Sequence, residues 1–259
     1  LRSNRGFPTG LLTGFMNFVA GIGKDFKTDY IVFALDAKGT TFRNELFDNY
    51  KAQRPDVPED LLTQLPVAIS WVEKMGFKIA IRTGYEADDM VASIAKDAKE
   101  KGFEVRIVSH DKDLYQLIDD ENSVYLFDPT KKQIINEAKC IEKYGVTPKQ
   151  FIDYQALVGD TADNIPGVKG VGAKTAQTLI EQFGTLENIY ENIENIDKKR
   201  TKELLIEGKE NAFLSKQLVT LKDDCHFISN IDEFSLPLEN PILKIASDLE
   251  SYDMHRIIE

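Results

Sequence analysis

The sequence predicts an α/β fold in which a core built on a parallel sheet is followed by a mostly helical region. Three apolar runs predict buried strands at 29–36, 77–81 and 103–109, and helical patterns lie between them. Strands that alternate with helices are typical of a parallel sheet. After about residue 136 the pattern becomes helical. We therefore expect a core over 1–136, a helical region over 137–222, and a tail over 223–259 that leads to a further domain.

Local signals predict the other elements. Helices are expected at 7–26, 58–76 and 86–102, a further strand or hairpin at 123–127 and 132–135, and a short helix near the end of the tail. Pro66 should kink the second helix because it removes a backbone donor, and Gly102 marks the end of the third. Residues 37–58 have weak periodicity and mixed charge. We expect them to form a long mobile excursion, a kind of segment that is often functional.

Composition restricts the class of protein. The chain has 259 residues, of which 42% are hydrophobic, so it can form the core of one large domain or of two small ones. No apolar run approaches the ~18 residues of a spanning helix, and no membrane partner is expected. Cys140 and Cys225 match no metal spacing, which predicts free thiols in a reducing cytoplasm. The net charge of −11 argues against nucleic acid, but the charge is unevenly distributed.

Acidic side chains follow each of the three predicted strands, and a fourth set lies in the helical region. The eight candidates are Asp36; Glu86, Asp88 and Asp89; Asp111 and Asp113; and Asp160 and Asp163. Because ligands bind beyond the carboxyl ends of parallel strands, the first three sets should meet at one sheet edge. Converging carboxylates repel one another unless cations bind. Oxygen ligands select hard ions, so we predict two Mg²⁺ or Mn²⁺ ions, an arrangement suited to phosphodiester cleavage.

Each acidic set also has a plainer interpretation. Asp36 alone is an ordinary residue at a strand end, and the run from Glu86 to Asp89 is an ordinary acidic helix start. Asp111 and Asp113 can cap a helix, although capping accounts for one Asp better than for two. Three sets at one sheet edge are harder to attribute to coincidence.

A glycine-rich turn runs directly into a helix within residues 164–184. Its glycines let backbone N–H groups approach a ligand closely, and the start of a helix attracts phosphate. Residues 166–176 contain no acid. This helix–hairpin–helix pattern predicts contact with a nucleic-acid backbone rather than with bases; a plain turn between helices is the alternative. The candidate DNA-binding residues are Gly167, Lys169, Gly170, Gly172, Lys174 and Thr175.

Two other stretches, 38–54 and 197–209, carry a local excess of positive charge. The first adjoins Asp36, and we interpret it as a substrate clamp. A solvated helix face explains the second stretch equally well.

Five stretches together resemble the 5′-nuclease (flap endonuclease) family, in particular the N-terminal 5′→3′ exonuclease region of bacterial DNA polymerase I. They are FALDAKGTTFR, NYKAQRPDVPEDL, GYEADDMVASIA, VSHDKDLYQL and GDTADNIPGVKGVGAKTA, and they span nearly the whole chain. The resemblance implies a PIN-like core with a helical arch at about 37–58 and a helix–hairpin–helix region. It implies metal-dependent hydrolysis at DNA 5′ ends, flaps and nicks, including RNA-primed ends, during primer removal and repair. The implied state is a monomer within a larger polymerase chain.

The resemblance also implies residue roles. Glu86, Asp88, Asp111 and Asp113 would hold the first ion or its waters, Asp160 and Asp163 would belong to the second, and Asp36 and Asp89 would complete the cluster. Arg43, Lys51 and Arg54 match arch positions that contact the scissile phosphate. Among these three, Lys51 is the expected source of transition-state charge stabilisation. The hairpin would hold duplex DNA, with K⁺ bound there.

The family begins with a strand that ends in an Asp, and the resemblance starts after that strand. We therefore expect one strand and one metal ligand to be missing, with impaired catalysis and stability. The alternatives are a non-catalytic remnant that binds DNA structures and a standalone 5′-nuclease paralogue. A PIN-type ribonuclease would share the carboxylates but would not need the hairpin.

Overall fold

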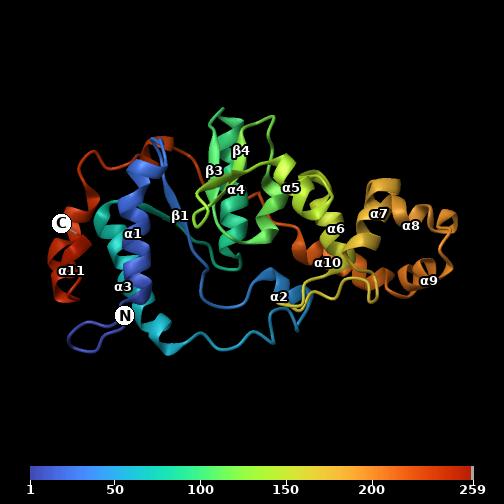
Figure 1. Cartoon of the computed structure of the whole chain (residues 1–259), viewed down its shortest axis with the longest axis horizontal. Helices are drawn as coiled ribbons and strands as arrows, with labels where there is room; N and C mark the ends of the chain where they lie inside the picture. The colour runs from blue at the N-terminus through green and yellow to red at the C-terminus, as the bar shows by residue number, and fades with distance from the viewer. Residues whose placement is uncertain (258–259) are drawn as a thin grey trace. The chain divides into compact units, whose positions relative to one another are not determined.

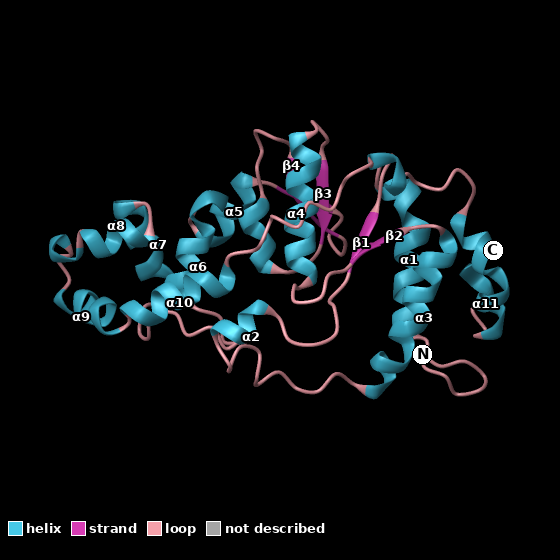
Figure 2. Cartoon of the chain, turned by 180° about the vertical axis from the view of Figure 1, so that it is seen from behind, coloured by secondary structure: helices cyan, strands magenta, loops and turns pink. Residues whose placement is uncertain are grey.

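The computed structural model describes residues 1–257, with the side chains of 23–25 left aside. The chain forms two compact units. The first comprises residues 1–35, 55–80 and those from 229 onward, and the second comprises 36–54 and 81–228 (Figures 1 and 2). No helix in residues 1–257 has both the length and the hydropathy to cross a bilayer. All eight candidate carboxylates lie in the second unit.

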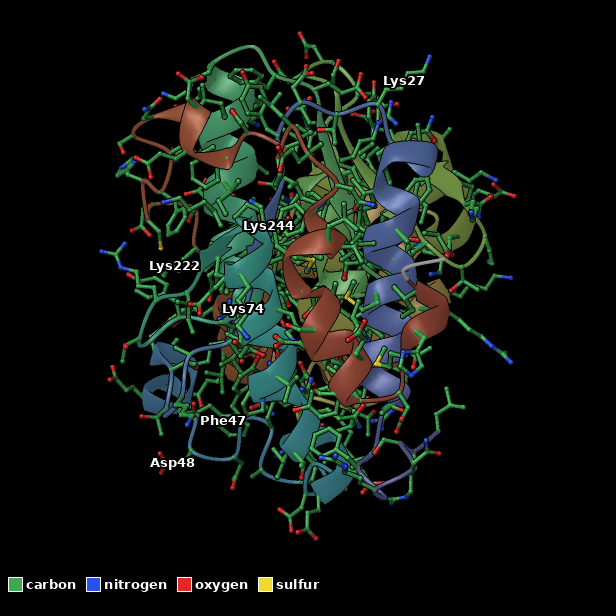
Figure 3. The ribbon with its side chains drawn as sticks, turned by 90° about the vertical axis from the view of Figure 1, so that its left-hand side faces the viewer. Lys27, Phe47, Asp48, Lys74, Lys222 and Lys244 are labelled. Atoms are coloured by element: carbon green, nitrogen blue, oxygen red, sulfur yellow. The ribbon has the colours of Figure 1, made fainter. Side chains whose placement is uncertain are left out.

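The first unit is a helical layer with a two-stranded sheet. Its elements are α1 (Gly10–Asp25), β1 (Val32–Ala34), α3 (Glu59–Met75), β2 (Lys78–Ala80), η4 (Ile231–Phe234), η5 (Pro241–Ile245), α11 (Ala246–Ser251) and η6 (His255–Ile257). Helices α1 and α3 lie side by side and bury Leu12, Met16 and Trp71 between them (Figure 1). Lys74 of α3, labelled in Figure 3, forms an ion pair with Asp248 of α11 at 2.6 Å. The tail therefore packs within the same unit as the first residues of the chain.

The second unit contains a three-stranded sheet and a helical part. Its elements are α2 (Phe42–Leu46), α4 (Ala87–Glu100), β3 (Val105–Val108), η1 (Lys112–Leu117), β4 (Val124–Asp128), β5 (Gln133–Ile135), α5 (Glu137–Tyr144), η2 (Pro148–Gln150), α6 (Phe151–Val158), α7 (Ala173–Phe183), α8 (Leu186–Glu191), η3 (Ile193–Asn195), α9 (Lys199–Glu207) and α10 (Lys209–Val219). Helix α6 packs against both α7 and α10, with Phe151 and Leu157 fully buried (Figure 1).

The mixed α/β class is confirmed, but the expectation of one parallel sheet is corrected. Strand β1 pairs with β2 in parallel, whereas β3 pairs in parallel with β4, which continues into an antiparallel hairpin with β5. The strands are three to five residues long, and β1, β2 and β3 are shorter than the apolar runs that predicted them. Hydrophobic pattern predicts that a segment is a strand, but its partner depends on contacts that are distant in sequence.

The expected excursion at 37–58 is only slightly helical. It contains the five-residue helix α2, followed by turns at 48–53. Hydrogen bonds attach these turns to the loop after α6. The amide of Lys51 donates to the carbonyl of Asp163 at 3.0 Å, and the side chain of Gln53 donates to the carbonyl of Thr161 at 2.7 Å. We therefore describe 47–54 as a docked segment.

The loop at 159–167, which carries two of the acidic candidates, is closed by two glycines in contact. Gly159 has φ +74°, and a Cβ there would lie 2.6 Å from the carbonyl oxygen of Ile165. A Cβ on Gly167 (φ +59°) would lie 2.5 Å from the amide nitrogen of Gly159. Backbone therefore packs directly on backbone, and any side chain at either position would force the loop open.

We expect Gly159→Ala to lower the free energy of unfolding by about 2–3 kcal/mol, because it adds a backbone clash to an unfavourable φ. Gly184→Ala is the matched control: its φ is +82°, but nothing lies within 4 Å of the added Cβ. That control should cost only about 1 kcal/mol. Urea denaturation of both variants measures the difference, and equal losses would show that the glycine contact is unimportant.

Candidate metal centre and active site

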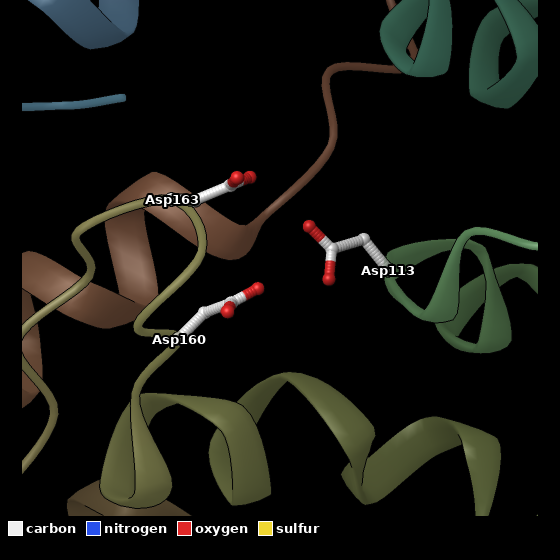
Figure 4. Close-up of side chains that lie close together, drawn as sticks. All are labelled: Asp113, Asp160 and Asp163. Carbon is white, nitrogen blue, oxygen red and sulfur yellow. The ribbon is translucent and has the colours of Figure 1, made fainter. Parts of the chain in front are cut away.

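Three carboxylates converge in the second unit. Asp113 lies at the start of η1, just after β3, whereas Asp160 and Asp163 lie in the loop after α6. One oxygen from each lies within 4.8 Å of the others, and Figure 4 shows the three carboxyl groups turned toward a common space. All three residues are buried. The arrangement brings together groups that are up to 50 residues apart in sequence.

The two aspartates around Lys112 have different positions. Asp111 is the N-cap of η1, and its side chain accepts a hydrogen bond from the amide of Asp113 at 2.9 Å. Asp113 is directed into the buried cluster instead. The pair thus combines a capping residue with a residue held beside other carboxylates, and capping alone does not explain it.

A second group of carboxylates, formed by Glu86, Asp88 and Asp111, shares Asp113 with the first group. Burial, with Asp111 and Asp113 as like-charged neighbours, raises the pKa of Asp88 to about 7. Burial also raises the pKa of Asp113 to about 6, with further repulsion from Asp111, Asp160 and Asp163 and a hydrogen bond from Gln155 that acts in the opposite direction. Glu86 is a weaker neighbour of Asp88. The site therefore holds more negative charge than it can neutralise by itself.

The donor set fits hard divalent cations. It consists of carboxylate oxygens without sulfur or imidazole, which suits Mg²⁺ or Mn²⁺. The raised pKa values of Asp88 and Asp113 indicate the same need for positive charge. Asp113, Asp160 and Asp163 are the residues that could hold one ion together.

Repulsion among the carboxylates predicts how the stability of the metal-free chain depends on pH. The folded pKa of Asp88 lies above its unfolded value of about 4, so between these values the folded state binds more protons, and stability falls as pH rises. Asp88→Asn should therefore be more stable than the parent in EDTA at pH 8, by on the order of 2 kcal/mol, and about equally stable at pH 4. Thermal melts at both pH values measure this. A parent that is the more stable of the two at pH 8 would contradict it.

Three cationic side chains pair with the acidic residues. Lys51 Nζ lies 2.5 Å from Glu86 and 3.9 Å from Asp163, and Arg54 forms an ion pair with Asp163. Lys112 Nζ lies 2.9 Å from Asp160. These side chains are partly exposed, at 25% for Lys51, 51% for Arg54 and 40% for Lys112. They can therefore turn toward a ligand at the cluster.

Lys51 is held in an unusual backbone conformation. Its φ of +56° lies in the left-handed region, which residues with a Cβ rarely adopt. Such a conformation persists when surrounding bonds impose it. Here the amide of Lys51 is bonded to the carbonyl of Asp163, and the hydroxyl of neighbouring Tyr50 donates to Glu86 at 3.0 Å.

Arg43 occupies a different place from Lys51 and Arg54. It is 1% exposed, and its guanidinium donates to both oxygens of Asp89 at 2.8 Å, as well as to the carbonyls of Leu218 and Thr220. Burial opposes its charge, but the hydrogen bond to Asp89 and the negative charges of Asp89 and Glu86 together outweigh this, and the pKa of Arg43 is raised. Asp89 also accepts from the amides of Glu86 and Lys222. Nη1 of Arg43 also lies 3.2 Å from a carboxylate oxygen of Glu86, so this buried pair adjoins the acidic residues through Glu86.

The remaining candidates are dispersed. Asp36 is exposed, and its carboxylate accepts from the amide of Ala87 at 2.7 Å, so it caps α4. Gly167 is buried, and its amide donates to the hydroxyl of Ser215 at 2.9 Å. The other hairpin candidates lie at or near the surface where α7 begins, namely Lys169, Gly170, Gly172, Lys174 and Thr175.

Sequence reasoning missed two residues at the cluster. Lys112 was passed over between two aspartates, although it pairs with Asp160. Gln155 donates from Nε2 to Asp113 Oδ1 at 2.6 Å. A signal existed for Gln155, because it is a polar residue within FIDYQALV, a helix that is otherwise mostly apolar. Buried polar groups require partners, so such a residue points to one.

Family models match most of the chain. Residues 1–145 match the N-terminal resolvase-like domain of 5′-3′ exonucleases, and residues 146–241 match their C-terminal SAM fold. The chain belongs to the 5′-3′ exonuclease family.

Relatives in this family fall into two kinds. DNA polymerase I of Helicobacter pylori strain J99 is 43% identical over 258 residues, covering 97% of this chain but 28% of the polymerase. This chain thus spans little more than a quarter of that relative. The 5′-3′ exonuclease of Aquifex aeolicus strain VF5 is 35% identical over 262 residues, covering all of this chain and 87% of that protein.

Solved structures agree on the fold. The T5 5′-exonuclease with bound zinc ions has a TM-score of 0.73 at 24% identity, covering 96% of this chain and 93% of that one. A T5 flap endonuclease described as a pseudo-enzyme-product complex with DNA and metal ions has a TM-score of 0.71, also at 24% identity, covering 92% and 89%. The family's fold therefore extends over almost the entire chain.

Proposed function

We propose that this chain is a divalent-metal-dependent 5′→3′ exonuclease and 5′-flap endonuclease that hydrolyses DNA phosphodiesters. The observation that carries the proposal is the convergence of Asp113, Asp160 and Asp163 in a chain of the 5′-3′ exonuclease family. The similar T5 structures are described with bound metal ions, and one of them with DNA, which supports the choice of cofactor and substrate. In the cell, we propose a role in primer removal and DNA repair, as part of a cytoplasmic DNA polymerase I or as a separate exonuclease.

Two Mg²⁺ or Mn²⁺ ions would be held by the overlapping groups, with Asp160 and Asp163 in one, Glu86, Asp88 and Asp111 in the other, and Asp113 shared by both. Bound ions supply charge neutralisation at the phosphate and activation of the attacking water. The chain supplies the rest. Lys51 and Arg54 pair with Glu86 and Asp163 at the cluster. A phosphodiester bound at the cluster would compete with Glu86 and Asp163 for the cationic groups of Lys51 and Arg54. Lys51 would then stabilise the negative charge that develops in the transition state.

Substrate binding is assigned to the start of α7 and to the docked segment. Helix α7 has no acid in its first turn, and Gly170 lets the preceding turn pass close to a backbone phosphate. Lys169 and Lys174 add positive charge at the surface. We propose that this hairpin holds duplex DNA and binds K⁺. We also propose that residues 1–136 form a PIN-like core and that the docked segment corresponds to the arch.

The proposal is tested by cleavage of a 5′-labelled DNA flap in Mg²⁺ and in EDTA. Cleavage near the junction should require Mg²⁺ and should disappear in Asp113→Asn. The matched control is Asp60→Asn, an exposed aspartate of α3 that pairs with Arg2, which should cut at the parent rate. No cutting by the parent, with the flap still bound in a gel shift, would replace the proposal with a DNA-structure-binding function.

A further inference from the structure

Gln155 is a buried polar residue that belongs to none of the roles above. It is 3% exposed and lies in α6, four residues before Gly159, the first residue of the loop with Asp160 and Asp163. Its Nε2 donates to Asp113 Oδ1 at 2.6 Å, across 42 residues of sequence. Its carbonyl oxygen is buried and has no hydrogen-bond partner among the described residues. A buried unpaired acceptor destabilises the fold, so the amide needs an explanation.

The orientation of this amide follows from chemistry. Turning it over would place the carbonyl oxygen of Gln155 against Asp113 Oδ1, two acceptors without a hydrogen between them. The donor therefore faces the aspartate. One carboxylate oxygen is fixed by this bond, and fixing it also fixes the direction of the other oxygen.

The bond links the two chain segments that form the cluster. Asp113 comes from the segment after β3, whereas Asp160 and Asp163 come from the loop that α6 leads into. Because Gln155 is on α6, its hydrogen bond ties the carboxylate of Asp113 to the helix that leads into the loop with Asp160 and Asp163. The ion pair between Lys112 and Asp160 also joins these two segments, but only the bond from Gln155 acts on the carboxylate of Asp113 itself.

The main chain of Asp113 is anchored separately. Its amide donates to Asp111, and its carbonyl accepts from Gln116 Nε2 at 2.9 Å. The same Gln116 nitrogen donates to the carbonyl of Val219. Loss of the Gln155 bond should therefore free the side chain of Asp113 and leave its backbone in place.

We propose that Gln155 is a positioning residue of the metal centre, which orients Asp113 so that it binds one divalent cation together with Asp160 and Asp163. The cation is part of the proposed nuclease function, on which this inference rests. Groups that orient metal ligands typically change metal affinity by about 10- to 100-fold when they are removed. Gln155 should have an effect of this size, although it does not touch the ion.

The test is a calorimetric titration of the whole chain with Mn²⁺, without DNA. Gln155→Met keeps the length of the side chain and removes the donor, and it should weaken Mn²⁺ binding by about 10- to 100-fold. The matched control is Gln177→Met on α7, where Nε2 donates over the same 2.6 Å to a backbone carbonyl, that of Tyr144, instead of to a carboxylate. This control should bind Mn²⁺ within about twofold of the parent.

Flap cleavage provides the second readout. In Gln155→Met, raising Mn²⁺ to saturation should recover most of the rate, because the defect is in holding the ion. Should this variant fail to fold, Gln155→Asn takes its place, since it keeps the amide but is too short to reach Asp113. Parent-like Mn²⁺ affinity in the folded variant overturns the inference. A parent that binds Mn²⁺ but cuts no DNA overturns the proposed nuclease and leaves the role of Gln155 in metal binding intact.

Discussion

Lys51→Ala is expected to slow single-turnover cleavage of a DNA flap by about 10²–10³-fold, the usual loss when one preorganised stabiliser of transition-state charge is removed. The side chain is partly exposed, and its ammonium group lies between Glu86 and Asp163 at the edge of the acidic cluster. A phosphate bound at this edge would compete with these two carboxylates for the ammonium group. The measurement is the rate with enzyme in excess over DNA.

The same variant should bind Mg²⁺ at least as tightly as the parent, because the ammonium group competes with a metal ion for Glu86 and Asp163. Slower chemistry with undiminished metal affinity separates a catalytic role from damage to the metal centre. Lys51→Arg is the control that keeps the charge and should retain part of the rate. A Lys51→Ala variant that cuts at the parent rate would remove Lys51 from the mechanism.

Arg43→Met is expected to lower the free energy of unfolding by about 3–5 kcal/mol, since it leaves the Asp89 charge buried without its partner. Asp89 is completely inaccessible and would retain only the amides of Glu86 and Lys222 as donors. Two backbone carbonyls, those of Leu218 and Thr220, would also lose a donor. Chemical denaturation in EDTA measures the loss without a contribution from bound metal.

Arg54→Met is the matched control for this prediction. Its guanidinium also pairs with an aspartate, but it is 51% exposed, and the loss should be at most about 1 kcal/mol. The double variant Arg43→Met with Asp89→Leu should regain part of the lost stability, because it removes the uncompensated charge. If Arg43→Met costs no more than Arg54→Met, the buried pair does not hold this part of the fold together.

Local elements could be predicted from the sequence because their signals are local. The helix expected at 86–102 is α4 (Ala87–Glu100), and the hairpin expected at 123–135 is β4 with β5. Strand partners could not be predicted, and the single parallel sheet was the main error. The apolar runs carry no information about which other strand completes each backbone ladder.

The candidate site shows the same division. The three acidic sets after the strands were expected to meet at one sheet edge, with a fourth set in the helical region, and the structure groups Asp113 of the third set with Asp160 and Asp163 of the fourth. Asp89 has the same chemistry and lies one residue from Asp88, yet it faces Arg43 instead. The direction of the Asp89 side chain at the start of α4 depends on Arg43, which is 46 residues away. The spacing of residues in the sequence does not reveal that partner. For Gln155 the apolar run around it indicates burial, but its partner Asp113, 42 residues away, cannot be identified from the sequence.

The buried Arg43 also has a consequence for synthesis of the protein. Its carbonyl acceptors at Leu218 and Thr220 are 175 and 177 residues further along the chain. At the usual ~5–20 residues per second, a ribosome needs on the order of 10 s to make them after it has made Arg43. Until then, Arg43 can pair with Asp89 but lacks these two carbonyl acceptors. The buried pair of Arg43 and Asp89 therefore reaches its full set of hydrogen bonds only after residue 222 has been made.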